Sequence, residues 1–260
     1  MLRWFQGDLH IHTVLSPCAE LSLGPRDIVR QALDQGLDMI AITDHNATAN
    51  VAAVVQAASD TALVVIPGVE VATREDIHMI SLFPTLDSMD DFQKFLDQNM
   101  TPGENDVSLW GAQLIVDADE NILAEASQLL SLPLQQGYQR IITEVSERGG
   151  IIYPAHIDRK ANSMVKTLGF LPANLPFNVV EISRRADLKE AVQRYQSSGN
   201  LQLITASDAH DINQVGSART FFKMAAPNFA ELILACTRSM GRHVSVMETE
   251  EIIQSRSVVA

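Results

Sequence analysis

Histidines in this sequence stand where short apolar segments end. Of the seven histidines in the 260 residues, six lie within or at the carboxyl ends of such segments: His10, His12, His45, His78, His156 and His210. Two carboxylates accompany them, Glu70 within residues 67–71 and Asp208 two residues before His210. Converging imidazole and carboxylate groups are typical of zinc, manganese or iron sites, whereas calcium prefers oxygen ligands alone. The pattern therefore predicts a site for several divalent metal ions.

The elements that must position these residues are predicted to be buried strands alternating with helices. Segments rich in Val and Ile and apolar on both faces indicate parallel strands at 37–43, 62–71, 77–83, 150–154, 178–182 and 201–206. Segments bounded by Pro or Gly predict helices at 27–35, 88–98, 135–148, 187–197 and 228–239. We expect a parallel sheet, closed or wound, with helices outside. In a parallel barrel the carboxyl ends of the strands meet at one rim, where the candidate ligands would assemble.

Five short motifs carry a resemblance to a known family. They are residues 8–13 (DLHIHT), 43–46 (TDHN), 67–70 (PGVE), 154–156 (PAH) and 207–210 (SDAH). In this order they resemble the motifs of the PHP (polymerase and histidinol phosphatase) family, over roughly residues 7 to 216. The resemblance implies an α/β fold, a distorted (β/α)7 barrel of the PHP type, with a trinuclear metal centre and phosphoesterase activity.

The resemblance also implies ligands for two or three divalent ions of Zn, Mn or Fe. The first ion would be held by His10, His12, Glu70 and Asp208. The second would share Glu70 and add His78 and His156, and the third would take His45 and His210. Asp44 is placed to orient His45, since a ligating histidine usually has an outer partner.

The third ion needs one more ligand from the loop after the first strand. Six residues beyond His12, where many family members have a histidine, this chain has Cys18, whose thiolate would favour zinc or iron. Counting back from the proline that opens the first helix gives Glu20 instead, as in members that use a carboxylate. The sequence leaves open Cys18, Glu20 or neither.

The charge of the chain bears on its partners. With 19 basic and 32 acidic residues the net charge is −13, the wrong sign for a surface that follows a phosphate backbone. We therefore expect no duplex nucleic acid as a partner. The predicted metal cluster is locally positive, because three divalent ions outweigh its carboxylates, and it suits a small phosphorylated substrate.

The remaining composition predicts the cellular setting. No apolar run is long enough to span a bilayer, and the first residues lack the apolar core of a signal peptide. Cys18 and Cys236 are best interpreted as free thiols of a reducing compartment. We expect a cytoplasmic protein without a membrane partner.

These observations lead to a predicted reaction. A metal-dependent phosphatase would hydrolyse a small phosphomonoester, such as a nucleotide, a nucleoside bisphosphate or histidinol phosphate, with a metal-bridging hydroxide as nucleophile. Glu70 would bridge the metals, and Asp208 or a metal-bound water would assist the leaving alkoxide. Arg159 and Arg184 are favoured over their neighbours Lys160 and Arg185 as ligands for the substrate phosphate.

Two other functions remain open. An amidohydrolase-like enzyme that cleaves C–N or C–O bonds also begins with His-x-His on its first strand. A catalytically silent metal-binding module that regulates a partner would keep the same ligands.

One long excursion interrupts the predicted alternation of strands and helices. Residues 84–149 separate two strands by more than one crossover helix requires, and residues 111–123 predict a hairpin. We expect a single domain over 1–260, with an insertion on the rim at roughly 100–135 and a C-terminal tail at roughly 242–260.

Overall fold

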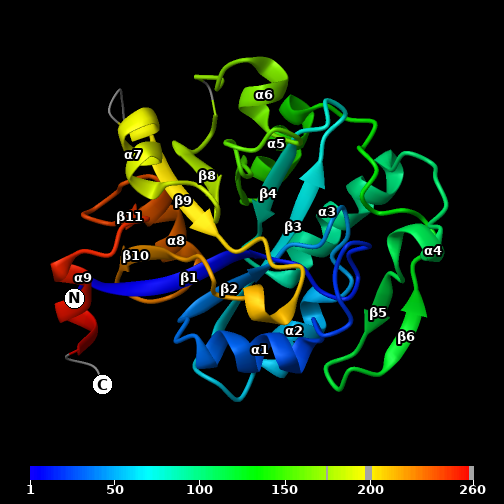
Figure 1. Ribbon diagram of the computed structural model, residues 1–260, viewed down its shortest axis with the longest axis horizontal. Helices are drawn as coiled ribbons and strands as arrows, with labels where there is room; N and C mark the ends of the chain where they lie inside the picture. The colour runs from blue at the N-terminus through cyan, green and yellow to red at the C-terminus, as the bar shows by residue number, and fades with distance from the viewer. Residues whose placement is uncertain (174, 197–200, 258–260) are drawn as a thin grey trace.

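The fold is built around a curled sheet of seven strands (Figure 1). The computed structural model describes residues 1–173, 175–196 and 201–257. In order across the sheet the strands are β11 (His243–Ser245), β10 (Thr220–Met224), β1 (Arg3–Ile11), β2 (Met39–Ile42), β3 (Val64–Ala72), β4 (His78–Leu82) and β7 (Ile151–Pro154).

A second, two-stranded sheet completes the barrel between β7 and β1. Its strands, β8 (Val179–Ser183) and β9 (Gln202–Ala206), run parallel. The amide of Ile157, after β7, donates to the carbonyl of Glu181 (2.9 Å), and the amide of His12, after β1, donates to the carbonyl of Ala209 (3.2 Å). These single bonds replace continuous ladders, which makes the structure a distorted (β/α)7 barrel, as the sequence predicts.

Helices cover the outside of the barrel. Those between β1 and β11 include α1 (Pro25–Asp34), α2 (Val51–Ala57), α3 (Leu86–Asn99), α5 (Tyr138–Glu147), α7 (Leu188–Gln196) and α8 (Phe229–Cys236). The sequence predicts all of these except α2; residue 197 of the predicted 187–197 helix lies outside the described residues. Pro25 opens α1, and Gly36, at a φ of +69°, follows its end. Among the described residues, no helix combines the length and hydropathy that a membrane span requires.

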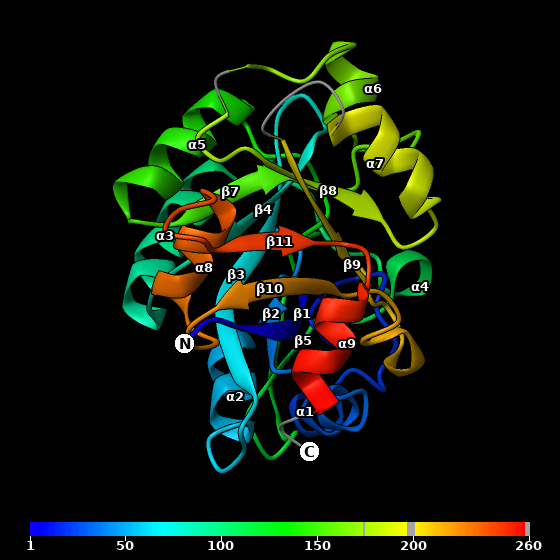
Figure 2. The same ribbon diagram turned by 90° about the vertical axis from the view of Figure 1, so that its left-hand side faces the viewer.

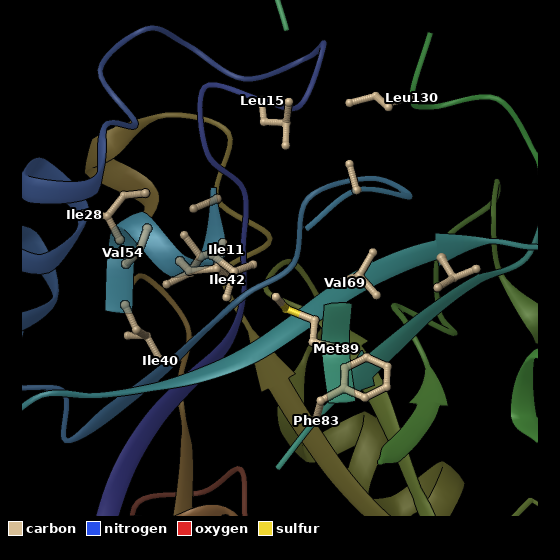
Figure 3. Packing of buried hydrophobic residues seen from close by; sticks show 14 of the residues in the cluster. Ile11, Leu15, Ile28, Ile40, Ile42, Val54, Val69, Phe83, Met89 and Leu130 are labelled. Atoms are coloured by element: carbon tan, nitrogen blue, oxygen red, sulfur yellow. The ribbon is translucent and has the colours of Figure 1, made fainter. Parts of the chain in front are cut away.

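The hydrophobic core fills the space between the sheet and these helices. Figure 3 shows Ile11 and Ile42 of the sheet beside Ile28 of α1 and Val54 of α2, and each of these side chains is fully buried. The buried apolar faces of α1 and α2 therefore fix the carboxyl ends of β1 and β2 in place.

Among the strands that the sequence predicts, the expectation of a parallel sheet is wrong for β4, and the sheet also contains two strands, β10 and β11, that the sequence analysis does not predict. β1, β2 and β3 are parallel, but β4 pairs antiparallel with both β3 and β7, and β10 and β11 are antiparallel to their neighbours. Five residues, 73–77, join β3 to β4, whereas a parallel crossover needs about a dozen or more. As a result, the start of β4 lies beside the end of β3, with His78 paired to Ala72.

The excursion between β4 and β7 contains a helix and a hairpin of its own. Besides α3 and α5 it holds α4 (Val107–Trp110), β5 (Leu114–Val116) and β6 (Ile122–Glu125), and the last two form the expected antiparallel hairpin. Buried Asn50, before α2, fixes this hairpin: its Nδ2 donates to the carbonyl of Leu114 (2.9 Å), and its Oδ1 accepts from the amide of Val116 (2.9 Å).

The C-terminal residues extend the main sheet. Figure 2 shows β11 beside β10 and α9 (Glu250–Ser257) next to them. Ile252 of α9 is fully buried in a small cluster with Trp4 and Phe221. Residues 258–260 of the expected tail lie outside the described residues. The part of the tail that the structure describes thus packs against the barrel.

Candidate metal centre

The six predicted histidines and both carboxylates come together at one end of the barrel. His10 lies near the end of β1 and His12 just beyond it. Between Asp8 and Ile11 the pairing of β1 with β2 shifts register. Such an irregularity changes the direction of the side chains and is common at functional sites. Glu70 is on β3 and His78 opens β4. His45, His156, Asp208 and His210 follow β2, β7 and β9.

The turns that carry these ligands hold unusual backbone conformations. His156, Asp208 and Asn46, which follows His45, have φ values of +29°, +49° and +47°. Residues other than glycine rarely adopt positive φ, and such strained positions concentrate at functional sites. Asn46 is fixed by its side chain, which donates to the carbonyls of Leu130 (2.8 Å) and Leu132 (2.9 Å).

Glu70 is the centre of the cluster. Its carboxylate is 1% exposed and lies within 3.4 Å of a nitrogen of each of five histidines. The distances run from 2.9 Å, between Oε1 and Nδ1 of His78, to 3.4 Å, for His10 and His12. Burial raises the pKa of Glu70, but His78, His10 and His45 lower it well below its usual range. This carboxylate is therefore an anion surrounded by imidazoles.

Three groups of side chains have ligand atoms close enough to share an ion, all within 4.8 Å of one another. They are His10, His12, Glu70 and Asp208; His45, Glu70 and His78; and His12, His45 and His210. In the first group, Nε2 of His10 is 3.2 Å from Nε2 of His12, and both nitrogens are 3.2–3.3 Å from Oδ1 of Asp208. His156 reaches Oε1 of Glu70 at 3.1 Å.

The donor set fits divalent cations. Ring nitrogens and carboxylate oxygens meet in a region from which solvent is excluded, and Oε2 of Glu70 is buried without a hydrogen-bond partner among the described residues. Burial lowers the pKa of His12, but the carboxylates of Asp208 and Glu70 raise it to about 9. This attraction for positive charge is what a bound cation would satisfy, and mixed imidazole and carboxylate ligands suit Zn, Mn or Fe.

Cys18 and Glu20 lie on the loop beside the third group but belong to none of the three. The Cys18 side chain is exposed and, after the larger effects of burial, which lowers the pKa of His45, and of Glu70, which raises it, contributes to raising that pKa. Glu20 is exposed, and its backbone amide donates to the carbonyl of His210 (2.9 Å). The third member of the group that contains His45 and His210 is His12, and not a residue of the loop.

A buried glutamate that the sequence analysis did not single out supports the first group. Glu181 of β8 is fully buried, and both its carboxylate oxygens are 3.1 Å from Nδ1 of His10. Its Oε1 also accepts from the amide of His156 (3.2 Å). The signal was present: a glutamate within the apolar segment 178–182 had to face a partner inside the barrel.

The sequence predicts that Asp44 contacts His45. In the structure the Asp44 side chain contacts the loop after β1 instead. It accepts from the amide and hydroxyl of Thr13 (2.7 Å each) and from the hydroxyl of Ser16 (2.6 Å). Ser16 Oγ lies 2.9 Å from Nδ1 of His12. Asp44 therefore supports His12 through Ser16, because the loop after β1 folds back over the end of β2.

The two predicted phosphate-binding arginines lie in different places. Nη2 of Arg159 is 2.5 Å from Oδ2 of Asp208, and its side chain is 40% exposed. Arg184 lines a separate pocket to which none of the candidate ligands contributes. Only Arg159 of this pair thus contacts the cluster directly among the described residues.

Comparisons with known proteins agree with this site. The PHP domain family model matches residues 8–214, and a PHP-associated model matches residues 189–250. A search of curated proteins finds no match.

Several solved structures share the fold. They include the lesion-specific endonuclease PfuEndoQ from Pyrococcus furiosus (TM-score 0.68, 17% identity, 93% of this chain and 57% of that chain). A second is an Endonuclease Q complex with a 27-mer duplex that carries an abasic lesion at the active site (0.66, 16%, 92% and 58%). A third is an amidohydrolase from Chromobacterium violaceum with bound sulfate (0.56, 18%, 81% and 89%). This chain spans somewhat over half the length of the first two, and at these identities the likeness concerns the fold.

The duplex complex overturns one expectation from the sequence. A protein of this fold has been solved on duplex DNA, so the exclusion of duplex nucleic acid as a partner is wrong. The net charge of −13 is a sum over the whole chain, whereas contact with a phosphate backbone depends on the local potential of one face and on any bound metal ions.

Proposed function

Because the chain belongs to the PHP domain family, we propose that its histidine and carboxylate cluster hydrolyses phosphoester bonds, with a small phosphomonoester as substrate. The family and the buried ligands indicate a metal-dependent hydrolase. The observation that carries the proposal is Glu70, a buried carboxylate with five imidazoles within 3.4 Å. Such a bridge between metal ions is the arrangement by which multinuclear sites cleave phosphoesters.

We assign two or three ions of Zn, Mn or Fe to the cluster. His10, His12, Glu70 and Asp208 would hold the first, and Glu70 with His78, His156 and His45 would hold the second. His45, His210 and either His12, Cys18 or Glu20 would complete a third. Bound divalent ions supply a Lewis acid for the phosphoryl oxygens and lower the pKa of water to about 7.

Residues of this chain prepare the site for substrate. Glu181 accepts the Nδ1 proton of His10 and thereby leaves the Nε2 lone pair facing Glu70 and Asp208. Arg159 pairs with Asp208 in the free protein, and its half-exposed side chain can turn to an incoming phosphate. Glu70 and Asp208 are the proposed catalytic carboxylates: Glu70 would be shared by the first two ions, and Asp208 or a metal-bound water would assist the leaving alkoxide once Arg159 has turned to the phosphate.

The test is a hydrolysis assay on protein reconstituted with manganese or zinc. The substrates are p-nitrophenyl phosphate, a panel of nucleotides, bis(p-nitrophenyl) phosphate and a duplex with an abasic site. His10→Ala should abolish turnover, while His243→Ala, a histidine outside the cluster that packs edge-on against Trp4, should retain it. Equal activity in wild type and His10→Ala, or none after confirmed metal loading, would refute the proposal.

The same panel separates the alternatives. If the protein hydrolyses the diester or the duplex but none of the monoesters, the proposed phosphoesterase activity stands and the proposed substrate is wrong. A lactone and a cyclic amide belong in the panel, because their hydrolysis without phosphatase activity would indicate an amidohydrolase-like enzyme. A metal-loaded protein that turns over none of them would be a regulatory module.

A further inference from the structure

A second pocket lies on the outer side of the barrel, away from the candidate ligands. Its volume is about 490 Å³, within the range of about 300–1,000 Å³ that small-molecule sites occupy. The walls come from β9, from the residues after β8, from β10 and the residues just before it, and from the segment after β11. The lining includes Arg184, Thr205, Ser217, Arg219, Phe221 and Val246.

Thr205 belongs to the lining of this pocket, and its hydroxyl is unsatisfied. The residue is 2% exposed, and its Oγ1 has no hydrogen-bond partner among the described residues. Its backbone is fully engaged, because Thr220 Oγ1 accepts from its amide (2.8 Å) and donates to its carbonyl (2.8 Å). A buried hydroxyl without a partner lowers stability, so its retention calls for an explanation such as a ligand.

The arginines of the pocket carry positive charge that no described carboxylate neutralises through an ion pair. Arg219 donates only to neutral oxygens: those of Gln6 (2.8 Å), Gln35 (2.8 and 3.2 Å) and Gly216 (2.6 Å). Arg184 is partly exposed and forms no ion pair with any described residue. The acidic residue of the lining, Glu248, is exposed. Within a chain of net charge −13, this pocket therefore attracts anions.

We propose that this pocket binds a phosphate-bearing small molecule. Arg184 pairs with the phosphate, and the hydroxyls of Thr205 and Ser217 donate to it, so that three side chains meet its three terminal oxygens. Arg219, held by neutral groups, contributes charge from a fixed position. Phe221 and Val246 form an apolar wall for the rest of the ligand. The site is independent of the catalytic proposal, since no candidate metal ligand lines it.

The test measures binding of inorganic phosphate and phenyl phosphate to chelator-treated protein by isothermal titration calorimetry. Removing metal ions eliminates phosphate binding that a metal centre would cause. Arg184→Gln should weaken binding at least tenfold, the loss expected for one charge-assisted contact. The matched control is Arg185→Gln, the next residue, which removes the same charge outside the pocket lining and should bind as wild type does.

Thr205→Val distinguishes ligand binding from a structural role. Valine keeps the shape and removes the buried unpaired hydroxyl, so the melting temperature should stay equal or rise while phosphate affinity falls. Phenyl phosphate should bind more tightly than inorganic phosphate because of the apolar wall. Absence of saturable binding to wild type, equal affinity in Arg184→Gln and Arg185→Gln, or no gain for phenyl phosphate would overturn the proposal.

Discussion

At the scale of single residues, Glu181 determines how His10 faces the cluster. A neutral imidazole carries one proton, and a carboxylate 3.1 Å from Nδ1 holds that proton on the side away from Glu70 and Asp208. The same carboxylate accepts from the amide of His156, whose φ is +29°. One buried carboxylate thus contacts both a candidate ligand, His10, and the strained turn that carries another, His156.

We predict that Glu181→Gln weakens metal binding about 10- to 100-fold, the usual effect of losing an outer partner of a ligating histidine. Glutamine preserves the shape and an acceptor for the His156 amide, so the fold should remain. Competition with a chromogenic chelator measures the affinity, and circular dichroism checks the fold. Glu125→Gln on exposed β6 is the matched control. Wild-type affinity in Glu181→Gln would contradict this role.

The two cysteines should differ in reactivity. Cys236 is fully buried, and burial raises the pKa of its thiol to about 12, so at pH 8 it presents almost no thiolate. Cys18 is exposed. We expect a thiol-specific disulfide reagent to modify one cysteine in the native protein and both after denaturation. Cys18→Ser should remove the native reaction, and Cys236→Ser should retain it; rapid modification of Cys236 would contradict its burial.

Zinc then tests the proposed role of Cys18. If the thiolate ligates a third ion, zinc should slow its modification, and chelator should restore the rate. An unchanged rate with zinc bound would leave Glu20 or His12 as the third ligand of that group.

Convergence of the candidate ligands was predictable from the sequence, and the group of His10, His12, Glu70 and Asp208 is the set that the family resemblance implies, but the two groups that contain His45 differ from the implied sets. Alternating polarity places His10 and His12 on one face, and strand ends place the others at one rim. The group to which His12 or His45 belongs depends on the loop after β1. Ser16, Asp44 and Cys18 lie close together there. That loop has no periodic pattern, so its contacts follow only from tertiary packing.

At the scale of elements, the number of residues that connect two strands determines whether the strands run parallel or antiparallel. Sequence patterning located β3 and β4, and apolar composition on both faces suggested parallel neighbours. The five residues between them permit only an antiparallel return, and this brings His78 to the ligand end from the first residue of its strand. Connection length is therefore a stronger guide to strand direction here than composition.

The hairpin β5–β6 depends on Asn50 for its position. Asn50→Ala would leave the carbonyl of Leu114 and the amide of Val116 without their partner, at a cost of about 1–3 kcal/mol for each buried group. We expect hydrogen exchange at Val116 to accelerate and limited proteolysis to cut within the hairpin. Asn121→Ala removes a side chain that, within the part of the chain that the structure describes, bonds to Asp117 inside the turn, and it should leave the attachment intact. Equal exchange in both variants would show that other contacts hold the hairpin.

At the scale of the whole molecule, summed charge proved a poor guide to partners. The net charge of −13 is a sum over regions of opposite local charge. One is a carboxylate cluster that attracts cations, and another is a pocket with two arginines that attracts anions. The barrel itself was predictable because its strands are strongly apolar. The role of β10, β11 and α9 was not, because β10 carries the charged residue Lys223 and β11 has only three residues. Among the side chains of α9 that the structure describes, only Ile252 is fully buried.

Metal removal should destabilise the whole chain. The candidate ligands come from segments as far apart in sequence as His10 and His210, and an ion would join these segments only in the folded state. At a free metal concentration of 100 times Kd, binding adds about 2.7 kcal/mol to the free energy of unfolding. For a chain of this length that corresponds to a fall of roughly 5–10 °C in melting temperature upon chelation.

Differential scanning calorimetry with and without chelator measures this shift. His10→Ala should lose most of it, because one ligand of the group shared with His12, Glu70 and Asp208 is gone, whereas His243→Ala should keep the wild-type shift. The chelated wild type and His10→Ala should then melt at similar temperatures, because both lack the same cross-link. A melting temperature that chelator leaves unchanged in wild type would mean that the ligand cluster folds without help from metal ions, and that the barrel's apolar core alone holds these strand ends together.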